Sequence, residues 1–165
     1  MKRATKIVAA VLAGSLVFLS APAWGTEVYV PVMEGRAGSE IVVPIMIDEV
    51  ENLAGIRLVL HYDASFLRFV EGTRTKHVNS LMHIINDKKP GVLIIVMAGA
   101  RGIKGKNFSI MDLKFRVKEV LRGNHTTSIV FKEVQLMSDE LKEVEAMATS
   151  STLTLLPAGV PKESP

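Results

Sequence analysis

The chain has 165 residues and no cysteine, a formal net charge of +3, and aromatic side chains at only 5%. Its length allows one domain with a sizeable core, and the missing cysteines exclude disulfides, thiolate metal sites and thiol nucleophiles. Lysine and arginine are scattered among acidic residues, so the charge gives no support to a role in binding nucleic acid.

The beginning of the chain has the pattern of an export signal. Three basic residues precede an apolar stretch from Ile7 to Leu19, and small residues suited to signal peptidase follow. The stretch would make about 20 Å of helix, short of a ~30 Å hydrocarbon core. We therefore expect a signal peptide over residues 1–25, cleaved within 23–25. The protein would be secreted or periplasmic, with no stable membrane span after cleavage.

From residue 28 onward, short runs of alternating apolar and polar residues are separated by turn-forming residues, which is typical of half-buried β-strands. The expected strands are Val28–Val32, Glu40–Asp48, Ile56–Tyr62, Leu67–Val70, Leu81–Asn86, Val92–Ala98, Met111–Val117, Thr127–Leu136 and Thr149–Leu155. Pro44 cannot donate a hydrogen bond to a neighbouring strand, so we expect an open side or a bulge at that residue.

Two of these strands are the most informative about which faces are buried and which are exposed. Ile56, Leu58, Leu60 and Tyr62 share one face of the first, and Arg57, Val59 and His61 share the other. This predicts a strand packed on a core by one face only. The run Val92–Ala98 is instead apolar on both faces, so it is either covered on both sides or presents an apolar patch to a partner.

The segments between strands are expected to be turns and loops. A turn is expected over 34–39, a loop over 49–55, a polar segment without clear period over 71–76, and a glycine-rich loop over 99–107. The basic glycine-rich loop lacks the Gly-Lys-Ser/Thr ending of a phosphate-cradling loop. Residues 138–147 fit either a helical turn or a loop. The pattern as a whole predicts an all-β, antiparallel β-sandwich of about nine strands over residues 26–156, followed by a flexible C-terminal tail over 157–165.

No motif selects a catalytic or metal site. The four histidines are widely separated, whereas a zinc site would usually contain a closely spaced pair. No pair of acids is singled out for glycosidase chemistry, and no Gly-x-Ser-x-Gly elbow is present. Oxygen-bearing residues between Asp48 and Asn52 could serve a calcium ion, but without EF-hand spacing. We expect no enzyme, no cofactor and no metal.

The order of the strands resembles a cohesin domain, the β-sandwich module that binds dockerins in cellulosome scaffolds and shares its fold with carbohydrate-binding modules. The resemblance rests on Gly35-Arg36-Ala37-Gly38 before Ile41-Val42-Val43-Pro44-Ile45, on the stretch Gly55–Val70 with Tyr62-Asp63 and Leu67, and on the strands Val92–Ala98, Met111–Val117 and Ile129–Val134. It implies a jelly-roll topology and a non-catalytic module with a dockerin-like protein partner.

The resemblance also implies a partner-binding face, built from the strands at 56–62, 81–86 and 92–98 and the strand before the last. The partner-binding residues that it indicates are Arg57, Val59, His61, Ile94 and Val96, with Leu141 in a loop where the family tends to place an apolar contact. Gly55 and Arg57 stand where the family usually carries Asn and Asp, and Gly99 stands where it usually carries an acid.

Two other functions stay open at this point. A direct carbohydrate-binding module would need aromatic platforms to stack on sugar rings, and the chain after the signal offers only Tyr29 and Tyr62 beside a few phenylalanines that fit the core period. A polysaccharide bound in a cleft remains open as a partner, with a link to extracellular polysaccharide degradation. An adaptor or assembly component of a cell-envelope or secretion machine would fit the same exported sandwich.

Overall fold

The structure is a computed structural model that describes residues 25–119 and 121–158. The expected signal peptide and C-terminal tail lie outside these ranges, except for Gly25, Pro157 and Ala158. The strands are β1 (Thr26–Tyr29), β2 (Met33–Arg36), β3 (Glu40–Tyr62), β4 (Leu67–Arg74), β5 (Met82–Asn86), β6 (Val92–Val117), β7 (His125–Met137), β8 (Glu143–Val144), β9 (Ala146–Thr149) and β10 (Ser151–Leu156). A 3₁₀ turn, η1 (Lys76–Val78), precedes β5.

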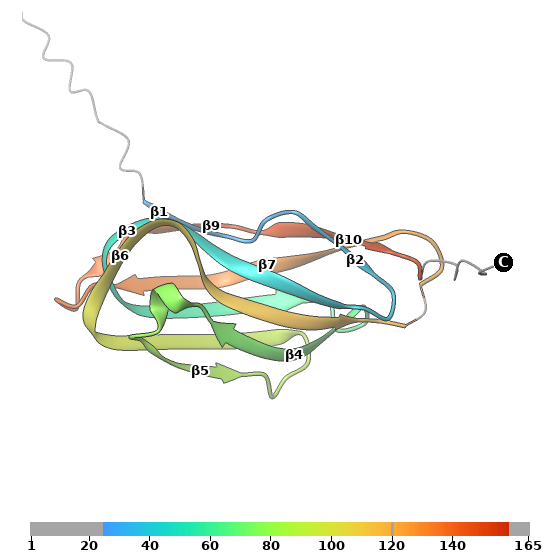
Figure 1. Cartoon of the computed structure of the whole chain (residues 1–165), viewed down its shortest axis with the longest axis horizontal. Coiled ribbons are helices and arrows are strands. Elements are labelled where there is room, and N and C mark those ends of the chain that lie inside the picture. Colours follow the sequence, from blue (N-terminus) through green and yellow to red (C-terminus); the bar gives the residue numbers. More distant parts are fainter. Residues whose placement is uncertain (1–24, 120, 159–165) are drawn as a thin grey trace, which may run out of the picture.

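Two long strands, β3 and β6, pair antiparallel along nearly their whole length and curve together at the left-hand end of Figure 1. The first half of β3 and the second half of β6 form one layer with β4, β1 and β9. The other halves form the second layer with β5 on one side and β7, β10 and β2 on the other. The sheet is thereby folded over itself, and the prediction of a jelly-roll β-sandwich is confirmed. Only β1–β9 and β10–β2 pair in parallel among the described strands.

The alternation of buried and exposed residues along β3 shows how one strand can belong to both layers. Odd-numbered residues from Ile41 to Ile47 are buried, whereas even-numbered residues from Ile56 to Leu60 are buried. The alternation is broken between Ile47 and Ile56, where Val50 is buried and Leu53 and Ala54 are adjacent and both buried, and the pairing with β6 shifts register twice between Val50 and Gly55. Because side chains alternate between faces, such a shift is needed to keep the apolar set inward after the strand changes layer.

The core lies between the layers and is built from aliphatic side chains around Phe115, which is fully buried. Tyr62 and Phe69 each meet Phe115 edge-on, with ring centroids 5.0 and 5.7 Å apart. At the β4–β5 margin, a Cβ on Gly72 would come within 2.4 Å of the Ile85 Cδ1 atom. The absence of a side chain at Gly72 therefore lets Ile85 pack across from the opposite layer.

Several expected strand boundaries were wrong because segments with the local character of turns or loops pair with strands that lie far away in the sequence. Residues 49–55 and 99–107, expected as loops, are parts of β3 and β6 that pair with each other through the bend, so no phosphate-cradling loop forms. β4 extends to Arg74 because Glu71–Arg74 pairs with β6. Residues 34–36 belong to β2, paired with β10. Residues 138–147 contain no helix, but a short loop followed by β8 and the start of β9.

As expected, β3 has an open side at Pro44. Pro44 pairs with Asp112 of β6, whereas the pairing of β3 with β1 involves Met46 and Ile47. The missing donor of the proline therefore falls beyond the end of the β1 ladder. No helix among the described residues reaches the length and apolar character that a bilayer crossing requires.

Candidate functional site

The outward surface of the layer that contains β5, β6, β3 and β7 forms a regular grid, which we call the four-strand face. Its side chains alternate with the buried residues of the same strands, such as Leu58 and Ile95. Three successive cross-strand rows define it: Met82, Ala98, Gly55 and Met137; then Ile84, Val96, Arg57 and Gln135; then Asn86, Ile94, Val59 and Glu133. In Figure 1, β5 runs along the lower margin of the molecule, so the β5 margin of this face is open.

The β5–β6 half of the four-strand face is apolar and exposed. Met82 is 77% exposed, Ile84 is 72% exposed, and Val96 is 40% exposed. Ile84 lies directly across from Val96, and Met82 lies across from Ala98, so these side chains are neighbours. A contiguous apolar patch on a rigid sheet is the usual signature of a surface that another macromolecule covers.

The β3–β7 half of the four-strand face is polar. Arg57 Nε lies 3.1 Å from Glu133 Oε1, and both side chains are about two-fifths exposed. Such an exposed pair contributes at most about 1 kcal/mol to stability. The pair leaves this half close to neutral while it presents both a cation and an anion at the surface. His61 lies at the end of this half, across from Val130.

All the residues expected from the sequence to bind a partner lie on or beside this face. Arg57, Val59 and His61 are on β3, and Ile94 and Val96 are on β6 beside them. Leu141 lies in the loop between β7 and β8, directly after Met137 of the face, and is 81% exposed. Its backbone is in the left-handed region with φ of 60°, a costly conformation for leucine. The placement is therefore fixed by its surroundings.

Hydrogen bonds hold the Leu141 loop in place. Ser138 accepts from the Leu141 and Lys142 N–H groups, and its own N–H donates to the Lys142 carbonyl. Asp139 anchors the loop to both long strands: it accepts from Asn52 Nδ2 at 2.6 Å and from the Gly102 N–H at 3.1 Å. The loop is thereby tied to the bend of β3 and β6, at the end of the four-strand face where Met82 and Met137 lie.

This anchor should depend on pH. The bond from Asn52, and then that from Gly102, lower the pKa of the Asp139 carboxyl below its ordinary value. The anchor therefore contributes to stability above the ordinary carboxyl pKa, and this contribution is lost as the pH falls through the lowered folded pKa. We expect the Asp139→Asn variant to unfold at a lower temperature than the wild type near neutral pH, and the two melting temperatures to converge below about pH 4. Thermal unfolding across this range checks it, and a gap unaffected by pH would contradict it.

Sequence reasoning missed the two most exposed side chains of the apolar half, Met82 and Ile84. The strand Leu81–Asn86 was expected, but it is apolar at both alternating positions, with Ile84 and Ile85 adjacent. The pattern alone therefore does not say which set faces outward. The structure decides this because Ile85 packs over Gly72 and leaves Ile84 in solvent.

Several of the other candidate ligand groups have contacts within the protein. Asp48 Oδ1 accepts from the N–H groups of Glu27 and Glu49, Glu49 pairs with Lys106, and Asn52 binds Asp139. One carboxylate oxygen of Asp48 and one of Glu49 are thus engaged within the protein, and the Asn52 amide nitrogen is turned toward Asp139. His125 and His77 lie against aromatic rings, at 5.0 Å from Phe66 and 5.1 Å from Phe108. In the part of the chain that the structure describes, no three His, Asp or Glu side chains gather as a metal site would need.

The aromatic residues do not form a sugar platform on the four-strand face. Tyr62, Phe66, Phe69 and Phe131 pack against the core, and Phe108 and Phe115 are buried. Among the described residues, Tyr29 alone lies apart from these, on β1 in the other layer. This face therefore offers no aromatic ring on which a sugar of a polysaccharide could stack.

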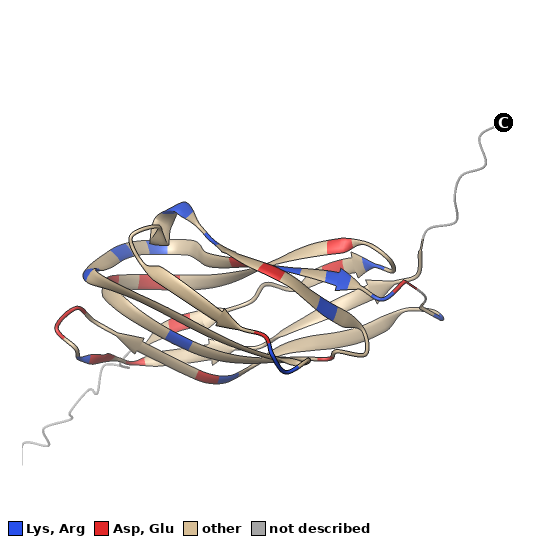
Figure 2. Cartoon of the chain, turned by 90° about the horizontal axis from the view of Figure 1, so that it is seen from below, with Lys and Arg blue, Asp and Glu red and all other residues tan. Residues whose placement is uncertain are grey.

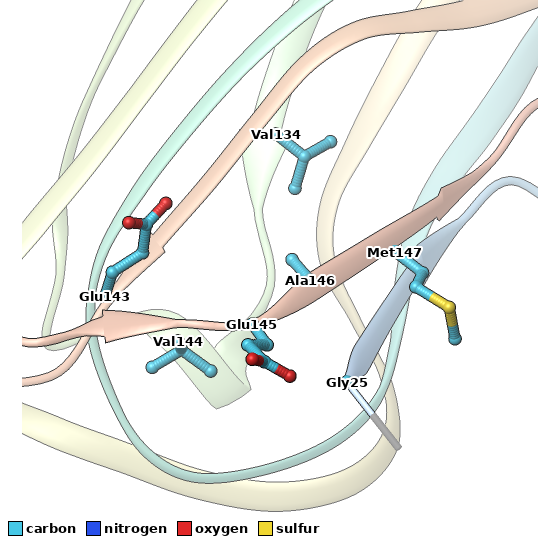
Figure 3. A pocket seen from close by; sticks show the side chains of 7 residues that line it. All are labelled: Gly25, Val134, Glu143, Val144, Glu145, Ala146 and Met147. Carbon is cyan, nitrogen blue, oxygen red and sulfur yellow. The ribbon is translucent and has the colours of Figure 1, made fainter. Parts of the chain in front are cut away.

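A separate hollow lies away from the face, where β8 and β9 meet β7 and the start of β1. It has a volume of about 710 Å³, and Figure 3 shows that the carboxylates of Glu143 and Glu145 on its rim point in different directions. Val134 and Ala146 supply apolar lining. Without converging polar groups, the hollow has no evident chemistry.

The outward surface of the other layer differs in character. Cross-strand ion pairs join Arg116 to Glu40 at 2.6 Å and Lys114 to Glu71. Figure 2 shows charges of both signs interspersed along the strands of the molecule. A surface with charges of both signs along its strands is well solvated and less suited to covering by another protein than an apolar one, so the four-strand face is the stronger candidate.

Comparisons with known proteins agree in one family. The family model described as "Cohesin domain" matches residues 26–155. "Cellulose-binding protein A" of Clostridium cellulovorans is 22% identical over 151 residues; the match covers 88% of this chain but only 8% of that protein's length.

Solved cohesin structures share the fold. The non-cellulosomal cohesin of the archaeon Archaeoglobus fulgidus has a TM-score of 0.71 at 20% identity, over 81% of this chain and 92% of that one. The sixth cohesin of Acetivibrio cellulolyticus scaffoldin B, solved in complex with a Cel5 dockerin, has a TM-score of 0.72 at 19% identity, over 80% and 99% of the two chains.

Proposed function

The chain belongs to the cohesin family, and on that premise we propose that it is a non-catalytic protein-binding module whose four-strand face receives a dockerin-type partner. The observation that carries this proposal is the exposed apolar cluster of Met82, Ile84 and Val96 on a rigid sheet. The Acetivibrio cellulolyticus relative was solved with a dockerin bound, which supports the same class of partner here.

The side chains of the four-strand face indicate which groups the partner's surface should carry. Apolar side chains should cover the β5–β6 half, because burying Met82 and Ile84 removes exposed apolar surface from water. Polar groups should meet the β3–β7 half, where the Arg57–Glu133 pair lies. An acidic side chain of the partner would compete with Glu133 for Arg57. We propose that this residue, standing where the family usually carries an acid, separates the partner of this chain from ordinary dockerins.

The cellular setting follows from the sequence pattern. We propose that the signal peptide is cleaved within residues 23–25 and that residues 26–156 act outside the cytoplasm as one domain, with a flexible tail over 157–165. A role in extracellular polysaccharide degradation would be indirect, through the enzyme or scaffold that carries the dockerin. The existence of a non-cellulosomal cohesin in Archaeoglobus fulgidus supports a second setting, in which the module assembles proteins with no cellulosome.

A capture experiment tests the proposal. The exported chain, immobilised, is offered dockerin domains encoded in its own genome and, separately, soluble and insoluble polysaccharides. We expect saturable capture of a dockerin and none of the sugar polymers. Capture of a polysaccharide with no dockerin would overturn the proposal in favour of a carbohydrate-binding module. Capture of envelope or secretion components in place of dockerins would overturn it in favour of an adaptor.

A further inference from the structure

A second hollow lies at the end of the sandwich opposite the β3–β6 bend, where β4 begins and β6 ends. It has a volume of about 370 Å³ and is lined by Arg68, Arg116 and Lys118 together with Ser65, Phe66 and Glu119. It belongs to the layer that does not carry the four-strand face. A partner docked on the four-strand face would therefore leave the charged side chains of this hollow uncovered.

Two of its cations belong to directly opposite residues of neighbouring strands. Arg68 of β4 is directly opposite Arg116 of β6, and both point outward because the flanking Leu67, Phe115 and Val117 are buried. Like charges directly opposite each other across a strand pair are destabilising. Arg116 Nη2 is paired with Glu40 Oε1 at 2.6 Å. Within residues 25–119 and 121–158, Arg68 and Lys118 form no ion pair.

A third observation concerns the Arg116 guanidinium. Its Nε is buried and has no hydrogen-bond partner, and it is the one buried side-chain polar atom in this state among the described residues. Leaving a buried donor unsatisfied costs the desolvation free energy of that group. That atom lies out of reach of the hollow, whereas the opposed side chains of Arg68 and Arg116 line it, and a bound ion of negative charge would relieve their repulsion.

We propose that this hollow binds a tetrahedral oxyanion, of which inorganic phosphate and inorganic sulfate are the simplest examples. Arginine forks present paired N–H groups that match the oxygen atoms of such ions. Arg68 and Arg116 bind the ion from adjacent strands, and Lys118 adds a third positive charge. Glu40 and Glu119 reduce the net charge of the cluster but do not cancel it. Because the cluster as a whole is positive, a phosphate or sulfate with more charge would gain more than a monoanion of carboxylate size.

Amide chemical shifts of the exported chain, followed during titration with phosphate or with sulfate at constant ionic strength, test the proposal. We expect saturable shifts at residues 65–68 and 116–119, and a loss of affinity of about tenfold or more in Arg68→Gln. Arg101→Gln removes the same charge from an exposed position in the β3–β6 bend, at the other end of the sandwich, and should bind like the wild type. The two titrations show which ion is preferred.

A second readout separates a site from a general salt effect. Without either ion, in dilute chloride, Arg68→Gln should melt at a higher temperature than the wild type, because it removes the opposed charges. With phosphate or sulfate, the wild type should gain more in melting temperature than the variant. Shifts that are linear, unsaturated and equal in wild type and Arg68→Gln would overturn the proposal. So would saturable binding that Arg68→Gln leaves unchanged.

Discussion

Replacing Ile84 by aspartate should weaken the binding of a dockerin partner by about 2 kcal/mol or more, roughly a thirtyfold rise in the dissociation constant. Ile84 lies at the centre of the apolar half of the four-strand face, across from Val96, and is 72% exposed in the free chain. The substitution should leave folding almost unchanged, since the side chain contacts solvent. In the complex it would place a carboxylate within an apolar contact. Isothermal titration calorimetry with the dockerin captured as described above measures the change.

The matched control for this variant is Val32→Asp. Val32 is 79% exposed and lies between β1 and β2, away from the four-strand face. The Val32→Asp substitution introduces the same charge at a comparably exposed apolar residue, so the affinity for the dockerin should match that of the wild type. Equal weakening by both variants would mean that charge alone is responsible. Unchanged binding in Ile84→Asp would exclude the β5–β6 half from the interface.

Replacing Leu58 by alanine should lower the free energy of unfolding by about 2–5 kcal/mol, a large part of the stability of an ordinary domain. Leu58 is fully buried at the middle of the second half of β3, between Ile95 of β6 and Val134 of β7. The lost side chain would leave a cavity that two neighbouring strands hold open. Urea unfolding followed by circular dichroism measures the loss.

The adjacent residue supplies the comparison. Val59→Ala shortens a half-buried side chain on the outward side of the same strand and should cost roughly 1 kcal/mol or less. The contrast between neighbours tests the assignment of inward and outward faces on β3. If Val59→Ala destabilised the chain as much as Leu58→Ala, that assignment would be wrong.

The faces of β3 could be predicted from the sequence because they depend on a local period of two residues. Ile56, Leu58 and Leu60 face the core as expected, and Arg57, Val59 and His61 face outward. The same reasoning indicated the apolar outer positions Ile94 and Val96. Where local pattern and burial agree in this way, alternation alone is enough to identify a half-buried strand.

The continuity of β3 and β6 could not be predicted, because the bend depends on contacts between residues far apart in the sequence. The polar run from Glu49 to Asn52 and the glycines between 99 and 105 have the local character of loops. They form strands because they pair with each other, and because Asn52 and Gly102 both bind Asp139, 87 and 37 residues away. Tertiary pairing overrides local propensity at this point.

The central claim, that the four-strand face receives a dockerin, is tested most directly by amide hydrogen exchange of the exported chain with and without the bound dockerin. We predict slower exchange on binding in residues 82–86, 92–98, 55–61 and 130–141, and no change in β1, β4 and β9 of the other layer. Protection confined to β1, β4 or β9, with the four strands of the face unaffected, would contradict the claim.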